Sequence, residues 1–386
     1  MKKILIFFLV ICYSCAEHSG HGLNKNNSDS GYSLKMAREV SIPLPPDEWN
    51  YSFLSIVKRF GDTTYLFRKA VLTNEIFVYN WDKKKRIKKI QWKETGPHRI
   101  LNFKQGAFYP LSLDEFVVAT PFNIYKTKND SVYFHKTLGS VKNFKDAYVI
   151  FGKTVFPPLR IGARIYMYSA AEGLRGTVKY YNSNRLMQFH LKDHSVSKLN
   201  FKFPRAYYKK CWGSGTSHYS ITKGKDSLLY VIFPVKPVVY TYDPVKEVFI
   251  DSVRFQSDYV NKKIKPIDCK VTGEPYRFHG FNQPKYRAIV YDPYREVFYV
   301  FVILPVSKEL YDKTNEPFTI SPLSIVVLDK NLNKLAEKKL EGGIYYYNEY
   351  FVTPEGLWIN KNSPHNENFD DDYLRFDLFV LHKERP

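Results

Sequence analysis

The chain has 386 residues, and its 58 lysines and arginines exceed its 38 aspartates and glutamates by enough to give a net charge of +20. Aromatic residues make up 17% of the chain, and 22 prolines are scattered between apolar runs. This composition argues against a helical bundle and favours many short strands joined by turns, with a surface that attracts anions.

The N-terminus has the pattern of an export signal. Met1–Lys3 supplies positive charge, and Ile4–Ile11 is an apolar run too short to anchor the chain across a bilayer. Ser14 immediately precedes Cys15, so the stretch resembles a bacterial lipoprotein signal in which Cys15 is the site of lipid attachment. An ordinary secretory signal without a lipid is the alternative.

We therefore expect three parts. Residues 1–15 form the signal peptide, residues 16–31 form a flexible tether rich in Gly, Ser, Asn and His, and residues 32–386 form a single domain. The lipid would hold the protein on a membrane of the bacterial cell envelope. The residues directly after Cys15 include one acid, Glu17, rather than the acidic run of a surface-export tag, so we expect the domain to face the periplasm.

Strands at the two ends of the domain are expected to meet. Glu39–Ile42 reads as the first strand, and Tyr373–Leu381 reads as the last. A ring of sheets must pair its ends to remove two exposed edges, so we predict that these strands share or adjoin a blade.

A hairpin pattern recurs along the chain. In Ala288–Leu304, an apolar run ends in Tyr-Asp-Pro and a second β-rich run follows, and the tract around Asp243 is a close copy. From Asp193 through Asp243 and Asp292 to Asp329 the intervals are 50, 49 and 37 residues. An all-strand repeat of roughly 40–50 residues is typical of a propeller blade, so we predict an all-β fold, a β-propeller of six or seven blades.

Two cysteines, Cys211 and Cys269, fall inside the predicted domain. In an oxidising envelope they can form a disulfide that stabilises the fold by roughly 4 kcal/mol in the chain-entropy model. Two free, buried thiols are the alternative, because the sequence does not show their separation.

The densest positive patch, Lys83–Lys89, lies in a predicted hairpin turn between Trp81 and Trp92. We interpret it as solvated surface charge and not as a nucleic-acid site, because an exported lipoprotein rarely meets nucleic acid. An anionic glycan, a peptide or an acidic envelope protein is the partner that the charge favours.

The connection before the Ala288–Leu304 hairpin gathers candidate ligand-binding residues. They are Glu274, Tyr276, Arg277, His279 and Arg287. Guanidinium groups bind carboxylates through forked hydrogen bonds, and tyrosine offers a stacking face. In the alternative interpretation, the arginines form salt bridges between blades and the histidine caps a turn.

Other polar loops do not match known catalytic or metal-binding patterns. Cys211–His218 lacks the Gly-x-Ser-x-Gly elbow of a serine hydrolase, and Glu367–Asp372 lacks the spaced acids and turn glycine of a calcium loop. We therefore assign no catalytic residue, no metal and no cofactor.

The decapeptide Tyr286–Arg295, together with the lipoprotein-like start, resembles an uncharacterised family of Bacteroidota lipoproteins with a domain of unknown function and a β-propeller-like fold. The resemblance implies the fold and the envelope location, and it implies no reaction.

We expect a binding or scaffolding lipoprotein for an anionic glycan, peptide or protein partner, and no enzyme. The alternative is a propeller lyase or hydrolase acting on an acidic polysaccharide, in which His279 or Tyr276 transfers protons while Arg277 and Arg287 neutralise a carboxylate. Convergence of these side chains on one pocket would favour the enzyme.

Overall fold

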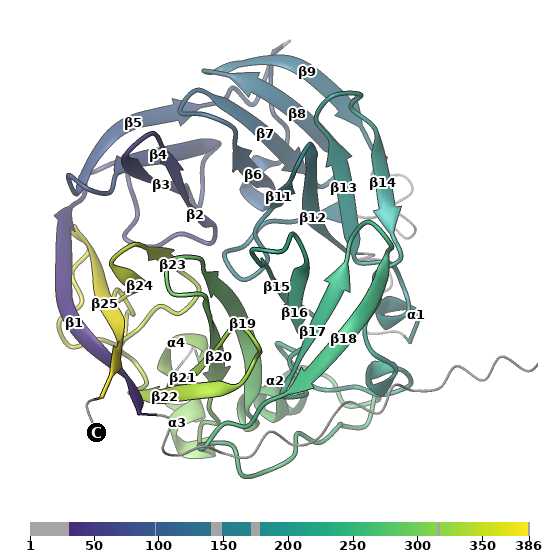
Figure 1. The fold of residues 1–386 in the computed structure, drawn as a ribbon, viewed down its shortest axis with the longest axis vertical. Helices are drawn as coiled ribbons and strands as arrows, with labels where there is room; N and C mark the ends of the chain where they lie inside the picture. The colour runs from purple at the N-terminus through teal and green to yellow at the C-terminus, as the bar shows by residue number, and fades with distance from the viewer. Residues whose placement is uncertain (1–30, 97, 140–148, 171–177, 315–316, 385–386) are drawn as a thin grey trace, which may run out of the picture.

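The computed structural model describes residues 31–384, except 97, 140–148, 171–177 and 315–316. The described residues form six antiparallel sheets, arranged as the blades of a propeller around a central channel (Figure 1). This confirms the predicted fold class. The predicted signal peptide, lipid-bearing Cys15 and nearly all of the tether lie outside the described residues.

The blades follow one another along the chain. The first contains β2 (Ser55–Phe60), β3 (Thr63–Lys69), β4 (Glu75–Asn80) and β5 (Lys85–Gln91). The second contains β6 (Ala107–Pro110), β7 (Glu115–Thr120), β8 (Asn123–Lys128) and β9 (Ser131–Thr137). The third contains β10 (Val149–Ile150) and β11 (Leu159–Ile161), which both pair with β12 (Arg164–Ala170), then β13 (Leu186–His190) and β14 (Val196–Leu199).

The other half of the ring continues this order. The fourth blade contains β15 (Ser220–Lys223), β16 (Leu229–Ile232), β17 (Val238–Asp243) and β18 (Val248–Arg254). The fifth contains β19 (Lys285–Asp292), β20 (Val297–Ile303), β21 (Leu323–Leu328) and β22 (Lys334–Leu340). The sixth contains β23 (Tyr350–Thr353), β24 (Gly356–Asn360), β25 (Tyr373–Lys383) and β1 (Tyr32–Pro43).

The first and last strands close the ring. β1 pairs antiparallel with β25, from Tyr32 opposite Lys383 to Pro43 opposite Tyr373. This confirms that the two ends of the domain share a blade, although both strands are longer than the sequence indicated. Figure 1 shows β1, in purple, beside β25, in yellow.

The blade repeat is longer than the sequence predicted. The inner strands begin at residues 55, 107, 159, 220, 285 and 350, so the intervals are 52, 52, 61, 65 and 65 residues. Asp292 lies between the first two strands of its blade, whereas Asp243 lies between the last two. Both turns use one local geometry, because each aspartate accepts backbone N–H groups two and three residues ahead. The distance between these two turns therefore does not equal the length of one blade, and the blade repeat predicted from it was too short.

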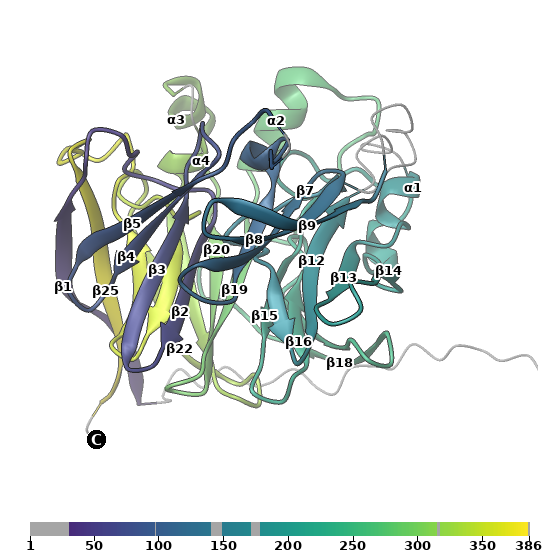
Figure 2. The ribbon, with the colours of Figure 1, turned by 90° about the horizontal axis from the view of Figure 1, so that it is seen from above.

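The two ends of the ring differ. Hairpins between the first and second strands and between the third and fourth strands form one end, here called the hairpin face. The connections between blades, together with those between the second and third strands of each blade, form the other end, the loop face. Figure 2 shows helices beyond the sheets at this face. The helices are α1 (Val178–Tyr181), α2 (Gly273–Phe281), α3 (Lys308–Asp312), α4 (Pro317–Ile320) and the 3-10 turns at Phe103–Gln105 and Arg205–Tyr207. Within the described chain, no helix has the length and apolarity needed to cross a membrane.

The segment between β10 and β11 crosses the loop-face end of the channel. The Thr154 Oγ1 accepts the Ser55 N–H at 3.1 Å, the Val155 carbonyl accepts from Ser220 Oγ at 2.5 Å, and the Thr154 carbonyl accepts from Tyr350 Oη at 3.3 Å. These three partners begin the inner strands of the first, fourth and sixth blades. One segment thus connects four blades at the channel entrance.

Buried charges join the sixth blade to the first. Glu349 accepts hydrogen bonds from Arg68 Nε at 2.7 Å, Ser55 Oγ at 2.6 Å and Asn360 Nδ2 at 2.8 Å. The Arg68 guanidinium also pairs with Glu48, and both side chains are about 1% exposed. Burial raises the pKa of Glu48 despite the nearby Arg68 charge. This network, the closure cluster, fixes the seam of the ring.

Candidate functional site

Four of the five predicted ligand-binding residues lie on α2 at the loop face. The helix begins after Thr272, and Glu274 in its first turn interacts favourably with the helix dipole. Glu274 and Arg277 face one another one turn apart, with 3.5 Å between Oε2 and Nη1, and both side chains are at least half exposed. The Arg277 partner is therefore in its own helix and not in another blade.

The imidazole of His279 holds a neighbouring loop. Its Nε2 lies 2.9 Å from the Lys265 carbonyl oxygen, and the Gln283 Nε2 donates to the same carbonyl at 3.1 Å. The Tyr276 carbonyl, in turn, accepts the Ser214 N–H at 3.4 Å. α2 is thus attached to two loops that precede and follow the fourth blade.

Arg287 has a different setting, on the inner strand β19. Its Nη2 donates to Asn348 Oδ1 at 3.2 Å, across the junction with the sixth blade. The alternative interpretation predicted that Arg287 forms a salt bridge between blades. The contact does join two blades, but its acceptor is the amide oxygen of Asn348 and not a carboxylate. The five residues thus occupy three settings, and their role in ligand binding stays a prediction.

A pocket lies beside this connection. Its volume is about 520 Å³, within the range of about 300–1,000 Å³ typical of small-ligand sites. We call it the basic pocket. It is lined by Trp212, Val235, Lys236, Pro237, Val238, Arg254, Phe255, Gln256, Ser257, Val260, Asn261, Lys262, Lys263, Ile264 and Tyr286. The five predicted ligand-binding residues are not among them.

Positive charge dominates the lining of the basic pocket. Lys236, Arg254, Lys262 and Lys263 are all exposed, and the lining residues include no aspartate or glutamate. Ser257 connects the lining to an acid outside it, because its Oγ donates to Glu337 Oε1 at 2.6 Å. A negatively charged ligand is therefore attracted by four cations at this site.

Three aromatic side chains form the apolar part of the basic pocket. Trp212, Phe255 and Tyr286 are 6%, 4% and 3% exposed, and the rings of Phe255 and Tyr286 meet edge to face at 5.4 Å. Burial raises the pKa of Tyr286, so its hydroxyl stays a neutral donor at physiological pH. The buried indole N–H of Trp212 has no hydrogen-bond partner among the residues that the structure describes. It is therefore a donor that a ligand can satisfy.

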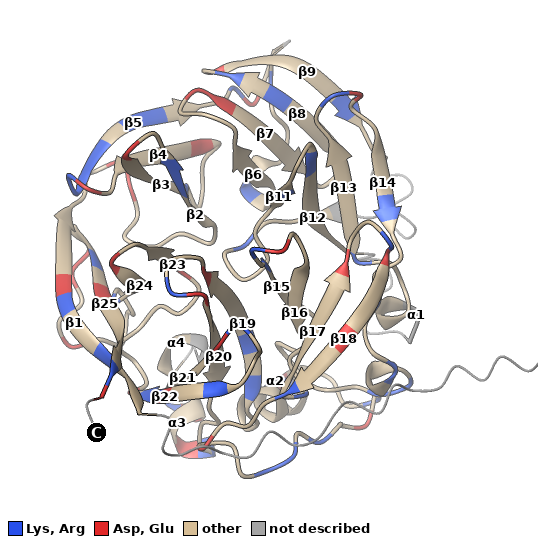
Figure 3. Ribbon diagram, in the orientation of Figure 1, with Lys and Arg blue, Asp and Glu red and all other residues tan. Residues whose placement is uncertain are grey.

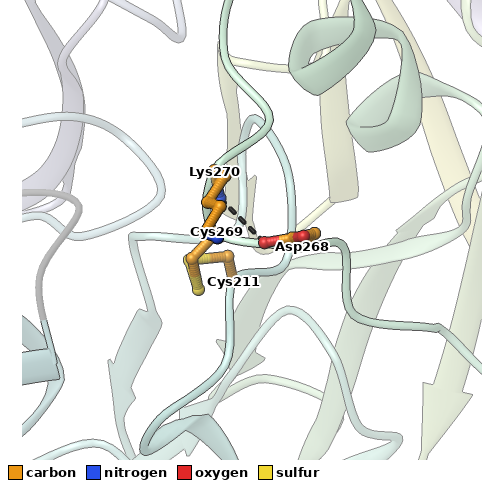
Figure 4. The surroundings of a disulfide bond; sticks show 4 residues. All are labelled: Cys211, Asp268, Cys269 and Lys270. Carbon is orange, nitrogen blue, oxygen red and sulfur yellow. Dashed lines mark hydrogen bonds between the residues drawn. A yellow bond between two sulfur atoms is a disulfide. The ribbon is translucent and has the colours of Figure 1, made fainter.

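A disulfide joins the two loops that contribute Trp212 and residues 260–264 to the pocket lining, and Figure 4 shows this bond. Cys211 and Cys269 have Cα atoms 5.2 Å apart and an S–S distance of 2.29 Å. Cys211 also forms a β-bridge with Ile267, whose N–H donates to the Cys211 carbonyl at 2.8 Å. Trp212 follows the first cysteine, and residues 255–264 precede the second. The bridge therefore limits how far these walls can separate.

Sequence reasoning did not identify the basic pocket. It considered Trp212 only as part of a loop compared with the serine-hydrolase motif, and it named Tyr286 only as part of the decapeptide that carries the family resemblance. It did not select Arg254, Lys262 or Lys263. The available signal was the Lys262-Lys263 pair between an aromatic residue and Cys269. Within the described ranges, no group of three or more His, Cys, Asp or Glu side chains is arranged to hold a metal ion.

Comparison with known proteins agrees with the fold. No curated protein matches the sequence. The crystal structure of a DUF4221 family member from Bacteroides vulgatus is similar, with a TM-score of 0.76 and 18% identity, over 91% of this chain and 99% of that one. A putative exported protein from Bacteroides fragilis has a TM-score of 0.53 and 10% identity, over 93% of this chain and 98% of its own.

At these identities the two structures show the fold alone. The model of the family described as domain of unknown function DUF4221 matches residues 48–339, which is more than half of the chain. The chain therefore belongs to the DUF4221 family of β-propeller proteins.

Proposed function

We propose that this protein is a binding module of the bacterial cell envelope and holds an acidic glycan in the basic pocket. The observation that carries the proposal is the lining of the pocket: four cations and no carboxylate stand beside three buried aromatic rings. Propeller strands provide a stiff frame, and the loops at one face provide the contacts.

The chemistry of the lining favours a sugar acid over a small inorganic ion. The Arg254 guanidinium can receive a carboxylate through two parallel hydrogen bonds, while Lys262 and Lys263 add charge at the rim. The buried rings and the Trp212 N–H offer an apolar face and one donor to the body of the ligand. A ligand with an anionic group and a partly apolar ring uses all of these features.

The proposal includes a lipid anchor at Cys15 and a tether over residues 16–31. Its support is the apolar run before Ser14-Cys15 in the sequence. In cells, Cys15→Ala should shift the protein from the membrane fraction to the soluble fraction and remove the mass of the lipid. Retention of Cys15→Ala in the membrane fraction would contradict the anchor and leave the pocket proposal intact.

The binding experiment uses the domain from Tyr32 onward with oligogalacturonate and with a neutral oligosaccharide of equal length. We expect saturable calorimetric binding of the acidic sugar that weakens as salt rises. Arg254→Ala should weaken it about tenfold or more, because a charge-assisted hydrogen bond is lost. Lys270→Ala is the matched control, because Lys270 is an exposed cation that directly follows Cys269 and does not line the pocket. Equal binding of the neutral sugar, or an equal loss in the control, would refute the proposal.

A further inference from the structure

A second group of positive charges lies toward the hairpin face of the channel, opposite the basic pocket. Four inner strands contribute to it: Lys58 comes from β2, Tyr109 from β6, Arg160 from β11 and Lys223 from β15. Each lies near the end of its strand that leads into a hairpin turn. Figure 3 shows basic segments near the labels of β11 and β15, close to the centre of the ring.

Hydrogen bonds and electrostatic interactions connect these four residues. Lys58 Nζ donates to Tyr109 Oη at 2.7 Å, and Lys223 Nζ lies 3.5 Å from the Arg160 carbonyl oxygen. The pKa of Lys58 is lowered to about 8, first by burial and then by the charges of Lys223 and Arg160. The field of Arg160 also acts on Tyr109. Three cations from three blades are therefore close enough to repel one another.

Neighbouring cations on the same face are neutralised, and these three are not. Arg59 pairs with Asp62 at 3.3 Å, and Lys225 pairs with Glu296 at 2.6 Å. Lys58, Arg160 and Lys223 form no ion pair with any residue that the structure describes. Lys225 and Lys223 are two positions apart, so the difference arises from where the side chains lie and not from local composition.

We propose that Lys58, Arg160 and Lys223, with the Tyr109 hydroxyl, form a binding site for a doubly charged oxyanion group, phosphate or sulfate. A phosphate group carries a charge of about −1.5 to −2 at neutral pH and several acceptor oxygens. It can therefore neutralise three converging cations better than a single carboxylate can. The group arrives either as the free ion or at the end of a larger molecule.

This site is independent of the proposed function, because it shares no residue with the basic pocket and lies at the other face. Its four contributors come from inner strands, and each of these strands is hydrogen-bonded along its length to the second strand of its own blade. The arrangement is thus fixed before the anion arrives, which lowers the cost of binding.

The experiment measures binding of inorganic phosphate at constant ionic strength, with sodium chloride as the reference salt. We expect one saturable site by calorimetry and a rise in Tm with phosphate. Lys58→Met and Lys223→Met should each weaken binding about tenfold or more. Lys83→Met is the control, because Lys83 is an exposed lysine in a hairpin turn of the same face. Glycerol 3-phosphate separates the two sources: equal or tighter binding indicates a phosphate monoester, and binding of inorganic phosphate alone indicates the free ion.

A second readout distinguishes this site from a merely structural cluster. Without phosphate, Lys58→Met should raise Tm, because it removes a partly buried charge that repels two others. With phosphate, the variant should no longer gain stability. Should Lys58→Met fail to fold, the exposed Lys223→Met keeps the test intact. No saturable binding of phosphate or of glycerol 3-phosphate, or an equal loss in Lys83→Met, would overturn the proposal.

Discussion

Removing Glu349 should weaken the whole ring, because its carboxylate lies where the last blade meets the first. Glu349→Ala leaves the Arg68 guanidinium with one carboxylate partner instead of two. It also leaves the Ser52 N–H and the Ser55 hydroxyl without this acceptor, and the Asn360 Nδ2 with the Asn50 carbonyl as its remaining acceptor. Breaking a buried ion pair typically costs about 3–5 kcal/mol. With an unfolding entropy of about 2.1 cal/mol/K per residue, a domain of this size should lose about 4–7 °C of Tm.

Thermal and urea unfolding of the domain from Tyr32 onward measure this effect. Glu355→Ala is the matched control, because Glu355 pairs with Arg38 and Lys84 at the surface and its side chain is 39% exposed. We expect the control to change stability by less than about 1 kcal/mol. A double-mutant cycle with Arg68→Ala should give a coupling of about 1–3 kcal/mol. Equal losses in Glu349→Ala and Glu355→Ala would refute a closing role for the buried carboxylate.

Three further changes test other parts of the fold. Gly152→Ala should lower the free energy of unfolding, measured in urea, by about 1–3 kcal/mol, because the new Cβ would lie 2.4 Å from the Ala107 Cβ. Gly139→Ala is the control: its new Cβ would lie 3.9 Å from the nearest atom, so it should change stability little. Lys285→Met should stabilise by about 1–3 kcal/mol at pH 6. Burial lowers the pKa of Lys285 in the folded protein to about 7, below its ordinary value of 10.5. Between these two pH values the unfolded chain binds more protons than the folded protein, so the stability of the wild type rises with pH. The stability advantage of Lys285→Met should therefore be smaller at pH 9 than at pH 6. An advantage that does not vary with pH would contradict a buried amine. Replacing Cys211 and Cys269 by serine should lower the unfolding free energy by about 4 kcal/mol in the chain-entropy model. The same change should weaken sugar binding measured by calorimetry. An unchanged affinity for the sugar would exclude a role for the disulfide in the basic pocket.

Local chemistry in the sequence determined the fold class. Alternating runs of β-branched and aromatic residues predict strands, and the aspartates at 243 and 292 predict turns through hydrogen bonds that reach only two or three residues ahead. Because patterns typical of strands and turns are much more frequent in this sequence than patterns typical of helices, only all-β folds such as sandwiches, barrels and propellers fit it. Pairing of the two chain ends also followed from the sequence, since a ring of sheets must cover its edges.

The blade period could not be obtained in the same way. The turn at Asp292 and the turn at Asp243 have the same local geometry but occupy different places in their blades. Only the pairing of β19 with β20 and of β17 with β18 distinguishes them. Strand order within a sheet depends on contacts between distant segments, and the local pattern does not encode it.

The candidate sites were decided by tertiary structure. The sequence determined that positive charge is in excess, and it placed lysines and arginines along the entire chain. It did not determine which of them have a counterion. Lys225 forms an ion pair with Glu296 of the next blade, whereas the Lys223 amine lies beside the Arg160 carbonyl. Charge pairing acts over a few ångströms in space, between residues that are far apart in the chain. The sequence therefore predicted an affinity for anions, and the packing of the blades alone decided where cations gather without a counterion among the described residues.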